Sequence, residues 1–198
     1  MARTRSDSAH RKVLEAVLEL VAEYGIEGTS MDAVAGRSGV SKATIYKHWA
    51  DKDALLLEML AVMNGLTDRP PFDSGNVRSD MEDVLSYRPP ENSEMRERIM
   101  PHFVAYSARN VNFGLTWRST IMEPPRKELR RLLRAGIAKG ELTSTLDEDV
   151  TLALLLGPMM YWYIFLRRTD DAPKDLARAV VDSFWRAYGL APRRGRRQ

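Results

Sequence analysis

The sequence predicts an all-α protein in which a small N-terminal domain precedes a larger helical domain. Apolar residues recur at every third or fourth position along most of the chain, which is the pattern of amphipathic helices. The alternation of apolar and polar residues that marks half-buried strands is absent. One stretch, Thr67–Asn76, combines prolines, glycine and short polar residues and therefore predicts a linker. With 198 residues, of which 44% are hydrophobic, the chain is long enough to bury a substantial core.

This linker indicates one domain at residues 1–65 and another at 77–190, followed by a basic tail at 191–198. Four of the last six residues are arginines, and without them 26 basic residues face 27 acidic ones. Bulk charge therefore does not identify a nucleic-acid-binding protein, and the local placement of charge must be considered instead. The tail is predicted to be unstructured and solubilising, with non-specific attraction to DNA as the alternative.

Four helices are predicted in the first domain, and short polar residues mark where most of them begin. They cover residues 8–24, 31–37, 42–48 and 52–65. Ser30, Ser41 and Asp51 each stand directly before one of the later three, where a side-chain oxygen can accept a hydrogen bond from a free backbone N–H. Gly25 is expected to end the first helix.

The second domain is predicted to contain six helices and no internal repeat. They cover residues 77–87, 92–109, 111–122, 126–139, 147–168 and 173–189. Pro124 and Pro125 are expected to restart the chain before the fourth of these helices, and Gly140 to end it.

One uncharged segment, Val150–Leu166, lies at the short limit for a membrane span. Gly157 and Pro158 in its middle favour instead a helix that protein covers on all sides, so we expect no membrane partner. The start of the chain is polar and basic, without the apolar stretch of a secretory signal. We therefore expect a cytoplasmic protein.

Metal and enzyme chemistry find no support in the sequence. The chain has no cysteine, and its three histidines, His10, His48 and His102, lie in separate parts of the chain without metal-ligand spacing. A paired acid and base, a nucleophile with its base, and a glycine loop that could cradle phosphates are all absent from the sequence. We expect no metal, no cofactor and no enzymatic activity.

Residues 30–49 carry the most informative motif. Two short predicted helices meet at a tight turn centred on Gly39, which is the sequence form of a helix-turn-helix. Apolar residues are spaced to hold these helices against each other and against helix 8–24; they are Val34, Ala35, Val40, Ile45 and Trp49. This spacing leaves the other face of helix 42–48 outside the core.

That outer face is rich in hydrogen-bond donors. A helix of this kind fits the major groove of DNA and presents its N-terminal side chains to base edges. Basic residues gather around the motif while glutamates lie along helix 8–24, so the basic patch is expected to contact phosphates. The predicted DNA-binding residues are Ser30, Ser41, Lys42, Ala43, Thr44, Tyr46, Lys47, His48 and Lys52. The alternatives are a solvated basic face for the lysines, a core position for Tyr46 and an ordinary surface histidine at 48.

Residues 8–63 resemble the DNA-binding domain of the TetR family of bacterial transcriptional regulators. The resemblance runs through Gly28-Thr29, Gly39-Val40-Ser41, Thr44-Ile45-Tyr46 and His48-Trp49. It implies a homodimer that binds a palindromic operator, usually as a repressor, and a helical C-terminal domain that binds a small molecule and thereby releases the DNA. Trp49 stands where the family usually has Phe or Tyr, which we expect to change only packing. Gly36 stands inside a short helix where a longer residue is usual, at a cost of about 1 kcal/mol.

The second domain holds aromatic residues that suit a small apolar or aromatic ligand. Apolar walls with few polar groups are typical of small-molecule pockets. The predicted ligand-binding residues are Phe103, Tyr106, Phe113, Trp117, Met122 and Met159. The alternative is that these side chains form ordinary core, in which case the chain is a helix-turn-helix DNA-binding protein that acts without a small ligand.

Segments 147–168 and 173–189 are predicted to join two copies of the chain into a homodimer. The first segment is apolar on all sides, whereas a helix inside a monomer needs only one apolar face. The remaining apolar surface would be larger than soluble monomers usually expose. Two such helices meeting their symmetry mates form a four-helix interface.

Overall fold

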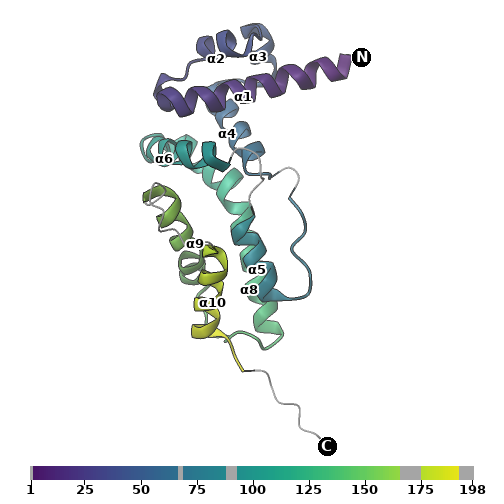
Figure 1. The fold of residues 1–198 in the computed structure, drawn as a ribbon, viewed down its shortest axis with the longest axis vertical. Coiled ribbons are helices and arrows are strands. Elements are labelled where there is room, and N and C mark those ends of the chain that lie inside the picture. The colour runs from purple at the N-terminus through teal and green to yellow at the C-terminus, as the bar shows by residue number, and fades with distance from the viewer. Residues whose placement is uncertain (1, 67–68, 88–92, 166–174, 192–198) are drawn as a thin grey trace, which may run out of the picture. The chain divides into compact units, whose positions relative to one another are not determined.

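The computed structural model describes residues 2–66, 69–87, 93–165 and 175–191, and this part of the chain is mainly helical (Figure 1). An isolated bridge between Leu142 and Gly189 is the only β-pairing among these residues. The predicted all-α class is therefore confirmed. The chain divides into two compact units, one made of Met1–Arg69 and Arg88–Glu123, the other of Pro70–Tyr87 and Pro124–Gln198.

The first unit contains the four predicted N-terminal helices. They are α1 (Ala2–Gly28), α2 (Met31–Ser38), α3 (Lys42–His48) and α4 (Lys52–Met63). Ser30, Ser41 and Asp51 cap α2, α3 and α4 as predicted, because each side chain accepts a hydrogen bond from the backbone N–H three residues further on. These caps satisfy backbone groups that such short helices could not pair internally.

The regular first helix breaks at Gly25, as predicted, and it starts earlier than the predicted residues 8–24; the label α1 continues across this kink to Gly28. Gly25 has a φ of 71°, in the left-handed region that glycine adopts without a steric penalty. The hydroxyl of Thr29 donates a hydrogen bond of 2.8 Å to the carbonyl of Gly25 and closes the interrupted turn. Gly25 is thus a break in direction, after which the chain completes one more turn to Gly28.

Three further helical segments belong to the first unit. They are α6 (Ser93–Arg109), α7 (Val111–Trp117) and the π-helical turn η1 (Arg118–Met122). α6 contacts α1, and η1 contacts α4. The core of this unit runs from Val17 of α1 through Leu60 of α4 to Phe103 of α6. The predicted helix 111–122 is present, but its second half is wound as a π-helix.

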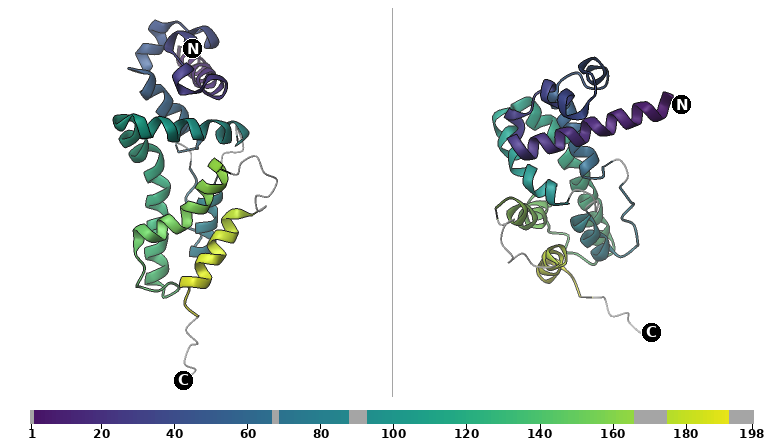
Figure 2. Two further views of the ribbon diagram at one scale, coloured as in Figure 1. Left: turned by 90° about the vertical axis from the view of Figure 1, so that its left-hand side faces the viewer. Right: turned by 45° about the horizontal axis from the view of Figure 1, so that its top comes forward.

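The second unit consists of four helices around a separate hydrophobic core. They are α5 (Val77–Ser86), α8 (Glu123–Ala138), α9 (Glu148–Phe165) and α10 (Leu176–Tyr188). Within this unit α9 (green) and α10 (yellow) lie side by side, and α10 also contacts α5 (Figure 2). α8 continues directly from η1 at Glu123 and does not begin at the predicted Arg126, so Pro124 and Pro125 do not restart the chain. The N–H of Glu123 still donates to the carbonyl of Arg118 in the π-helical turn before them.

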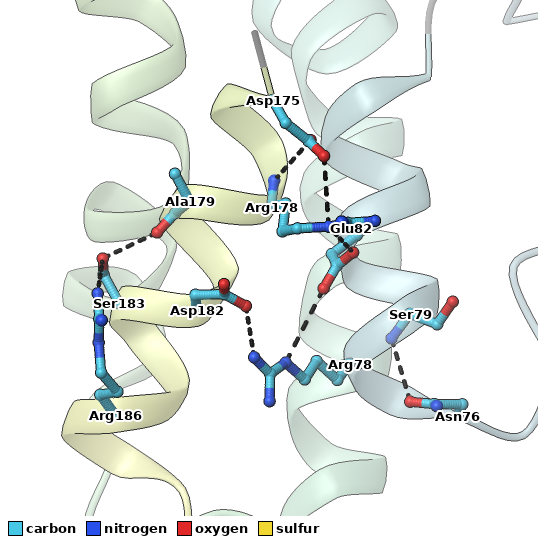
Figure 3. Close-up of polar contacts among 10 residues, drawn as sticks. All are labelled: Asn76, Arg78, Ser79, Glu82, Asp175, Arg178, Ala179, Asp182, Ser183 and Arg186. Atoms are coloured by element: carbon cyan, nitrogen blue, oxygen red, sulfur yellow. Dashed lines mark hydrogen bonds and ion pairs between the residues drawn. The ribbon is translucent and has the colours of Figure 1, made fainter. Parts of the chain in front are cut away.

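Ion pairs add to the apolar packing between α5 and α10 (Figure 3). Arg78 of α5 pairs with Asp182 of α10 and lies 3.9 Å from Glu82, one turn along its own helix. Arg178 of α10 lies 3.6 Å from the same Glu82 and 3.3 Å from Asp175. Exposed pairs of this kind contribute up to about 1 kcal/mol each, so the apolar core carries most of the stability.

The compact units do not follow the domain limits expected from the sequence. α6, α7 and η1 come after the linker in the chain, yet they pack with the N-terminal helices. The division into a DNA-binding domain at 1–65 and a regulatory domain at 77–190 describes functional regions, and it stays a prediction. Residues 192–198 of the basic tail lie outside the described residues. Within the described ranges, no helix combines the length and apolar character needed to span a membrane.

Candidate nucleic-acid interface

The turn between α2 and α3 is built around Gly39. Its φ of 68° lies in the left-handed region, which residues with a side chain rarely adopt. Its N–H donates a hydrogen bond of 3.0 Å to the carbonyl of Ala35 and closes the last turn of α2. The hydroxyl of Ser41 then accepts a hydrogen bond of 3.2 Å from the N–H of Thr44 and begins α3. The chain therefore passes from α2 to α3 in three residues, one fewer than the predicted helices 31–37 and 42–48 leave, because α2 extends to Ser38.

The inner faces of α2 and α3 are fixed in the core of the first unit. Val34, Ile45 and Trp49 are buried there, and Ala35 and Val40 pack against them half-buried. The predicted contacts of the motif are thus confirmed. Because Ile45 and Trp49 lie four residues apart on one face, α3 cannot rotate without exposing one of them.

The outer face of α3 carries most of the predicted DNA-binding side chains. Exposed on it are Lys42, Ala43, Tyr46, Lys47 and His48. Tyr46 is 49% exposed, so the core position considered for it is excluded. Thr44 is half-buried, and its hydroxyl lies 2.9 Å from that of Ser41. The structure therefore brings these residues together at the start and along the open side of one helix.

Several basic residues around the motif are already paired within the protein. Arg37 donates hydrogen bonds of 3.0 and 2.9 Å to the two carboxylate oxygens of Glu23, and these bonds hold the pKa of Glu23 below its usual value. Nζ of Lys42 lies 2.8 Å from Asp32, and this hydrogen bond raises the pKa of the lysine. Lys47 makes no ion pair with any described residue. The basic patch expected from the sequence is therefore partly neutralised.

Lys52 is held inside the unit. Its Nζ donates a hydrogen bond of 3.1 Å to the carbonyl of Ile26 and lies 5.8 Å from the ring centroid of Tyr106. The hydroxyl of Tyr106 in turn donates to Asp53 at 2.9 Å. The first turn of α4 is thereby tied to both α1 and α6. A phosphate contact by Lys52 stays a prediction. In the free protein, the carbonyl of Ile26 already accepts a hydrogen bond from its ammonium group.

Two residues near α3 are not predicted by the sequence. Glu58 of α4 accepts a hydrogen bond of 2.6 Å from the indole N–H of Trp49 and lies 2.7 Å from His10 of α1. The expectation that tryptophan at 49 changes only packing is therefore wrong. A buried indole usually requires an acceptor, but the sequence does not indicate which acid supplies it.

The candidate ligand residues divide between the two units. Phe103, Tyr106, Phe113 and Trp117 are buried in the core of the first unit, and Met122 packs against that core half-buried. Met159 lies in the core of the second unit. The structure therefore gathers the first five and does not place Met159 with them.

The two helices expected to form a dimer expose apolar side chains. The predicted segments 147–168 and 173–189 correspond to α9 and α10, and residues 166–174 lie outside the described residues. On α9, Leu154, Tyr161 and Phe165 are 48%, 53% and 72% exposed. A groove of about 470 Å³ runs between the helices and is lined by Leu154, Pro158, Val180 and Phe184 among others. The apolar surface that the sequence predicts is thus present on this face of the second unit.

Both halves of the chain match models of one protein family. Residues 13–59 match the family described as "Bacterial regulatory proteins, tetR family". Residues 71–184 match "Tetracyclin repressor-like, C-terminal domain".

Individual relatives agree with these matches. The HTH-type transcriptional regulator YdeS of Bacillus subtilis is 30% identical over 163 residues, which cover 80% of each chain. The DNA-binding transcriptional repressor TetR of Mycobacteroides abscessus is 22% identical over 146 residues, covering 74% of this chain and 77% of the relative.

Solved structures share the fold. A TetR-family protein from Rhodococcus sp. has a TM-score of 0.69 at 18% identity over 90% of this chain and 97% of its own. A transcriptional regulator from Saccharomonospora viridis in complex with choline has a TM-score of 0.67 at 17% identity over 93% and 100%. With both family models matched and the helix-turn-helix formed, the chain belongs to the TetR family of bacterial transcriptional regulators, and it is a DNA-binding protein and not an enzyme.

Proposed function

We propose that the protein is a one-component repressor that binds a palindromic operator as a homodimer and leaves it when a small apolar or aromatic ligand binds. The observation that carries the proposal is the outer face of α3, where Lys42, Tyr46, Lys47 and His48 are exposed on a helix whose inner face is anchored. A helix fixed in this way can enter the major groove as a rigid body and present its N-terminal side chains to bases.

Two arguments support the homodimer, one from the proposed operator and one from the surface of α9. A two-fold operator needs two reading helices about 34–36 Å apart, and one chain has a single α3. The exposed residues Leu154, Tyr161 and Phe165 of α9 provide an apolar face that a second copy can cover. Covering that face with the same face of another chain gives a closed, isologous pair.

The ligand is proposed to bind at the aromatic cluster of the first unit. Trp117 is only 6% exposed, and its indole N–H has no hydrogen-bond partner among the described residues. Buried donors are nearly always paired, so a mostly apolar ligand with one acceptor oxygen suits this position. The relative from Saccharomonospora viridis in complex with choline supports small-molecule binding in this fold.

Ligand binding can affect the position of α3 through contacts inside the first unit. The hydrogen bond from Tyr106 to Asp53 joins the aromatic cluster to the first turn of α4, which follows α3 directly. A ligand that displaces Tyr106 would therefore act on the support of α3. Coupling of about 1–3 kcal/mol is the usual range for two such sites.

A melting-temperature screen of metabolites and drugs tests the ligand part of the proposal. A compound that raises the melting temperature should also weaken operator binding. The Trp117→Phe variant should bind that compound more weakly and still bind the operator with unchanged affinity. The burial of Phe103, Tyr106 and Phe113 favours the second candidate, a helix-turn-helix protein without a small ligand. That candidate predicts operator binding that no compound changes.

A further inference from the structure

Three rings and one carboxylate meet at the C-terminal end of α3. One oxygen of Glu58 lies 2.7 Å from Nε2 of His10, and the other lies 2.6 Å from Nε1 of Trp49, the residue that ends α3. The ring centroids of His10 and Trp49 are 4.7 Å apart. The ring of His48 lies 5.6 Å from that of His10 and 5.5 Å from that of Trp49. We name the residues His10, Trp49 and Glu58 the Glu58 bridge.

The two oxygens of Glu58 serve different helices. An ionised carboxylate can only accept hydrogen bonds, so His10 of α1 and Trp49 after α3 each donate an N–H to it. Hydrogen bonds to a charged acceptor are shorter and stronger than those between neutral groups. The Glu58 bridge therefore fixes the end of α3 against α1 and α4 in a direction-dependent way, which apolar packing alone does not do.

The indole N–H of Trp49 makes the bridge possible. Phenylalanine at this position could fill part of the same space but would offer no donor to Glu58. Trp49 is only 2% exposed, so loss of the carboxylate would leave a buried donor without its partner. The hydrogen bond therefore requires both Glu58 and Trp49. If either residue only filled space in the core, its role would not depend on the other.

The bridge lies beside residues proposed to contact DNA. His48 is exposed in the last turn of α3, and its ring meets that of His10 edge-on. Lys47 precedes it on the same helix. Because binding groups must be held within about 0.5 Å of their productive positions, a small shift at this end of α3 moves both side chains out of register with the groove.

We propose that Glu58 is a positioning residue for operator recognition, which orients α3 by joining His10 to Trp49 without touching DNA. The inference rests on the proposed operator binding by α3. It makes a prediction of distinctive sign. Removing an acid near DNA should, by charge alone, strengthen binding to every duplex. Loss of the Glu58 bridge should instead weaken binding to the operator.

Two substitutions separate the charge from the hydrogen bonds. Glu58→Gln and Glu58→Leu both remove the charge, but only glutamine keeps an oxygen for Trp49 and an amide N–H for neutral His10. Affinity is measured for a duplex selected from a random library and for an unrelated duplex of equal length. We expect Glu58→Leu to bind the selected duplex about tenfold more weakly and Glu58→Gln to stay within about threefold of the unchanged protein. Both variants should bind the unrelated duplex alike.

Glu15 provides the matched control on α1. It is exposed and lies 3.8 Å from Arg11 on its own helix. Glu15→Gln and Glu15→Leu remove the same charge from the same unit, so they should bind the selected duplex equally well.

The indole N–H signal of Trp49 in a nitrogen-correlated NMR spectrum tests the contact itself. The signal is identified by its disappearance in Trp49→Phe. It should shift, and its proton should exchange faster, in Glu58→Leu but much less in Glu58→Gln. Trp49→Phe should also lower the affinity for the selected duplex. Glu58→Leu should then cost less affinity in the Trp49→Phe variant than it costs in the unchanged protein, because the hydrogen bond is already lost.

Three results would overturn the proposal. They are equal operator binding by the leucine and glutamine variants, an unchanged indole signal in Glu58→Leu, and unchanged operator affinity in Trp49→Phe. The last of these decides the question if Glu58→Leu fails to fold. If no duplex is selected from the library at all, operator binding itself is contradicted, whereas the indole signal still reports whether the Glu58 bridge exists.

Discussion

The hydroxyl of Tyr106 donates a hydrogen bond of 2.9 Å to Oδ1 of Asp53 and joins α6 to the first turn of α4. Burial of Tyr106, together with the hydrogen bond to Asp53, raises the pKa of the phenol to about 12. A residue that the sequence indicates as a ligand contact is therefore also a support of the DNA-binding helices. A ligand that displaces the side chain of Tyr106 would break this hydrogen bond.

Replacing Tyr106 with phenylalanine should lower the free energy of unfolding by about 1 kcal/mol near neutral pH, because Asp53 loses its donor. The folded state holds the phenolic proton more tightly than the unfolded chain does. The stabilisation that Tyr106 gives the folded state is therefore complete below the unfolded pKa of about 10. It is lost as the pH rises toward the folded pKa of about 12. Urea unfolding at neutral and at alkaline pH should show a smaller alkaline loss in Tyr106→Phe. An identical loss in both proteins would contradict the assignment.

Gly36→Ala should stabilise the protein by about 0.5–1 kcal/mol, because alanine has the higher helix propensity. Gly36 lies inside α2, and a Cβ added there would meet nothing within 4 Å. Urea denaturation measures the change, and Gly39→Ala serves as the comparison because its φ of 68° makes a side chain strained. Destabilisation by Gly36→Ala would show that the glycine has another role.

Lys47→Ala should weaken binding to all duplexes and reduce the slope of log affinity against log salt concentration by about 1. The reason is that Lys47 is exposed on α3 and makes no ion pair among the described residues. Lys42→Ala should reduce the slope less, since Lys42 is paired with Asp32. Lys127, exposed on α8, is the control whose replacement should leave the slope unchanged. An unaltered slope in Lys47→Ala would exclude a phosphate contact.

The double variant Leu154→Glu, Tyr161→Glu should convert a dimer into a monomer, because it places two carboxylates on the exposed apolar face of α9. Analytical ultracentrifugation should give twice the chain mass for the unchanged protein and the chain mass for the variant. Leu115→Glu, at an exposed apolar position on α7, is the matched control and should stay dimeric. An unchanged protein that sediments as a monomer at micromolar concentration would contradict the homodimer.

Local signals account for what the sequence predicts well. Ser30, Ser41 and Asp51 cap their helices because a cap requires only a side-chain oxygen and a backbone N–H three residues away. The turn at Gly39 is equally local, since it depends on the conformation of one residue. Such features can be recognised without knowing which helices meet.

Contacts between distant segments explain what the sequence does not predict. Arg37 and Glu23 lie in separate charge clusters along the chain, and they pair because α2 packs across α1. Similarly, nothing in the spacing of Trp49, Glu58 and His10 indicates that three segments bring them together. The placement of Met159 in the second unit, apart from the other candidate ligand residues, likewise depends on how the helices after the linker divide between two cores.

Selection of bound sequences from a random DNA duplex library tests directly whether α3 reads an operator as part of a homodimer. We expect an enriched inverted repeat whose half-sites are separated by about one helical turn or a multiple of it. Thr44→Ala should change the preferred base at one position of each half-site, by about 1–3 kcal/mol if it contacts that base. Operator reading by α3 is contradicted if no sequence is enriched. It is also contradicted if the enriched site lacks two-fold symmetry and the Thr44→Ala and Lys47→Ala variants select the same site.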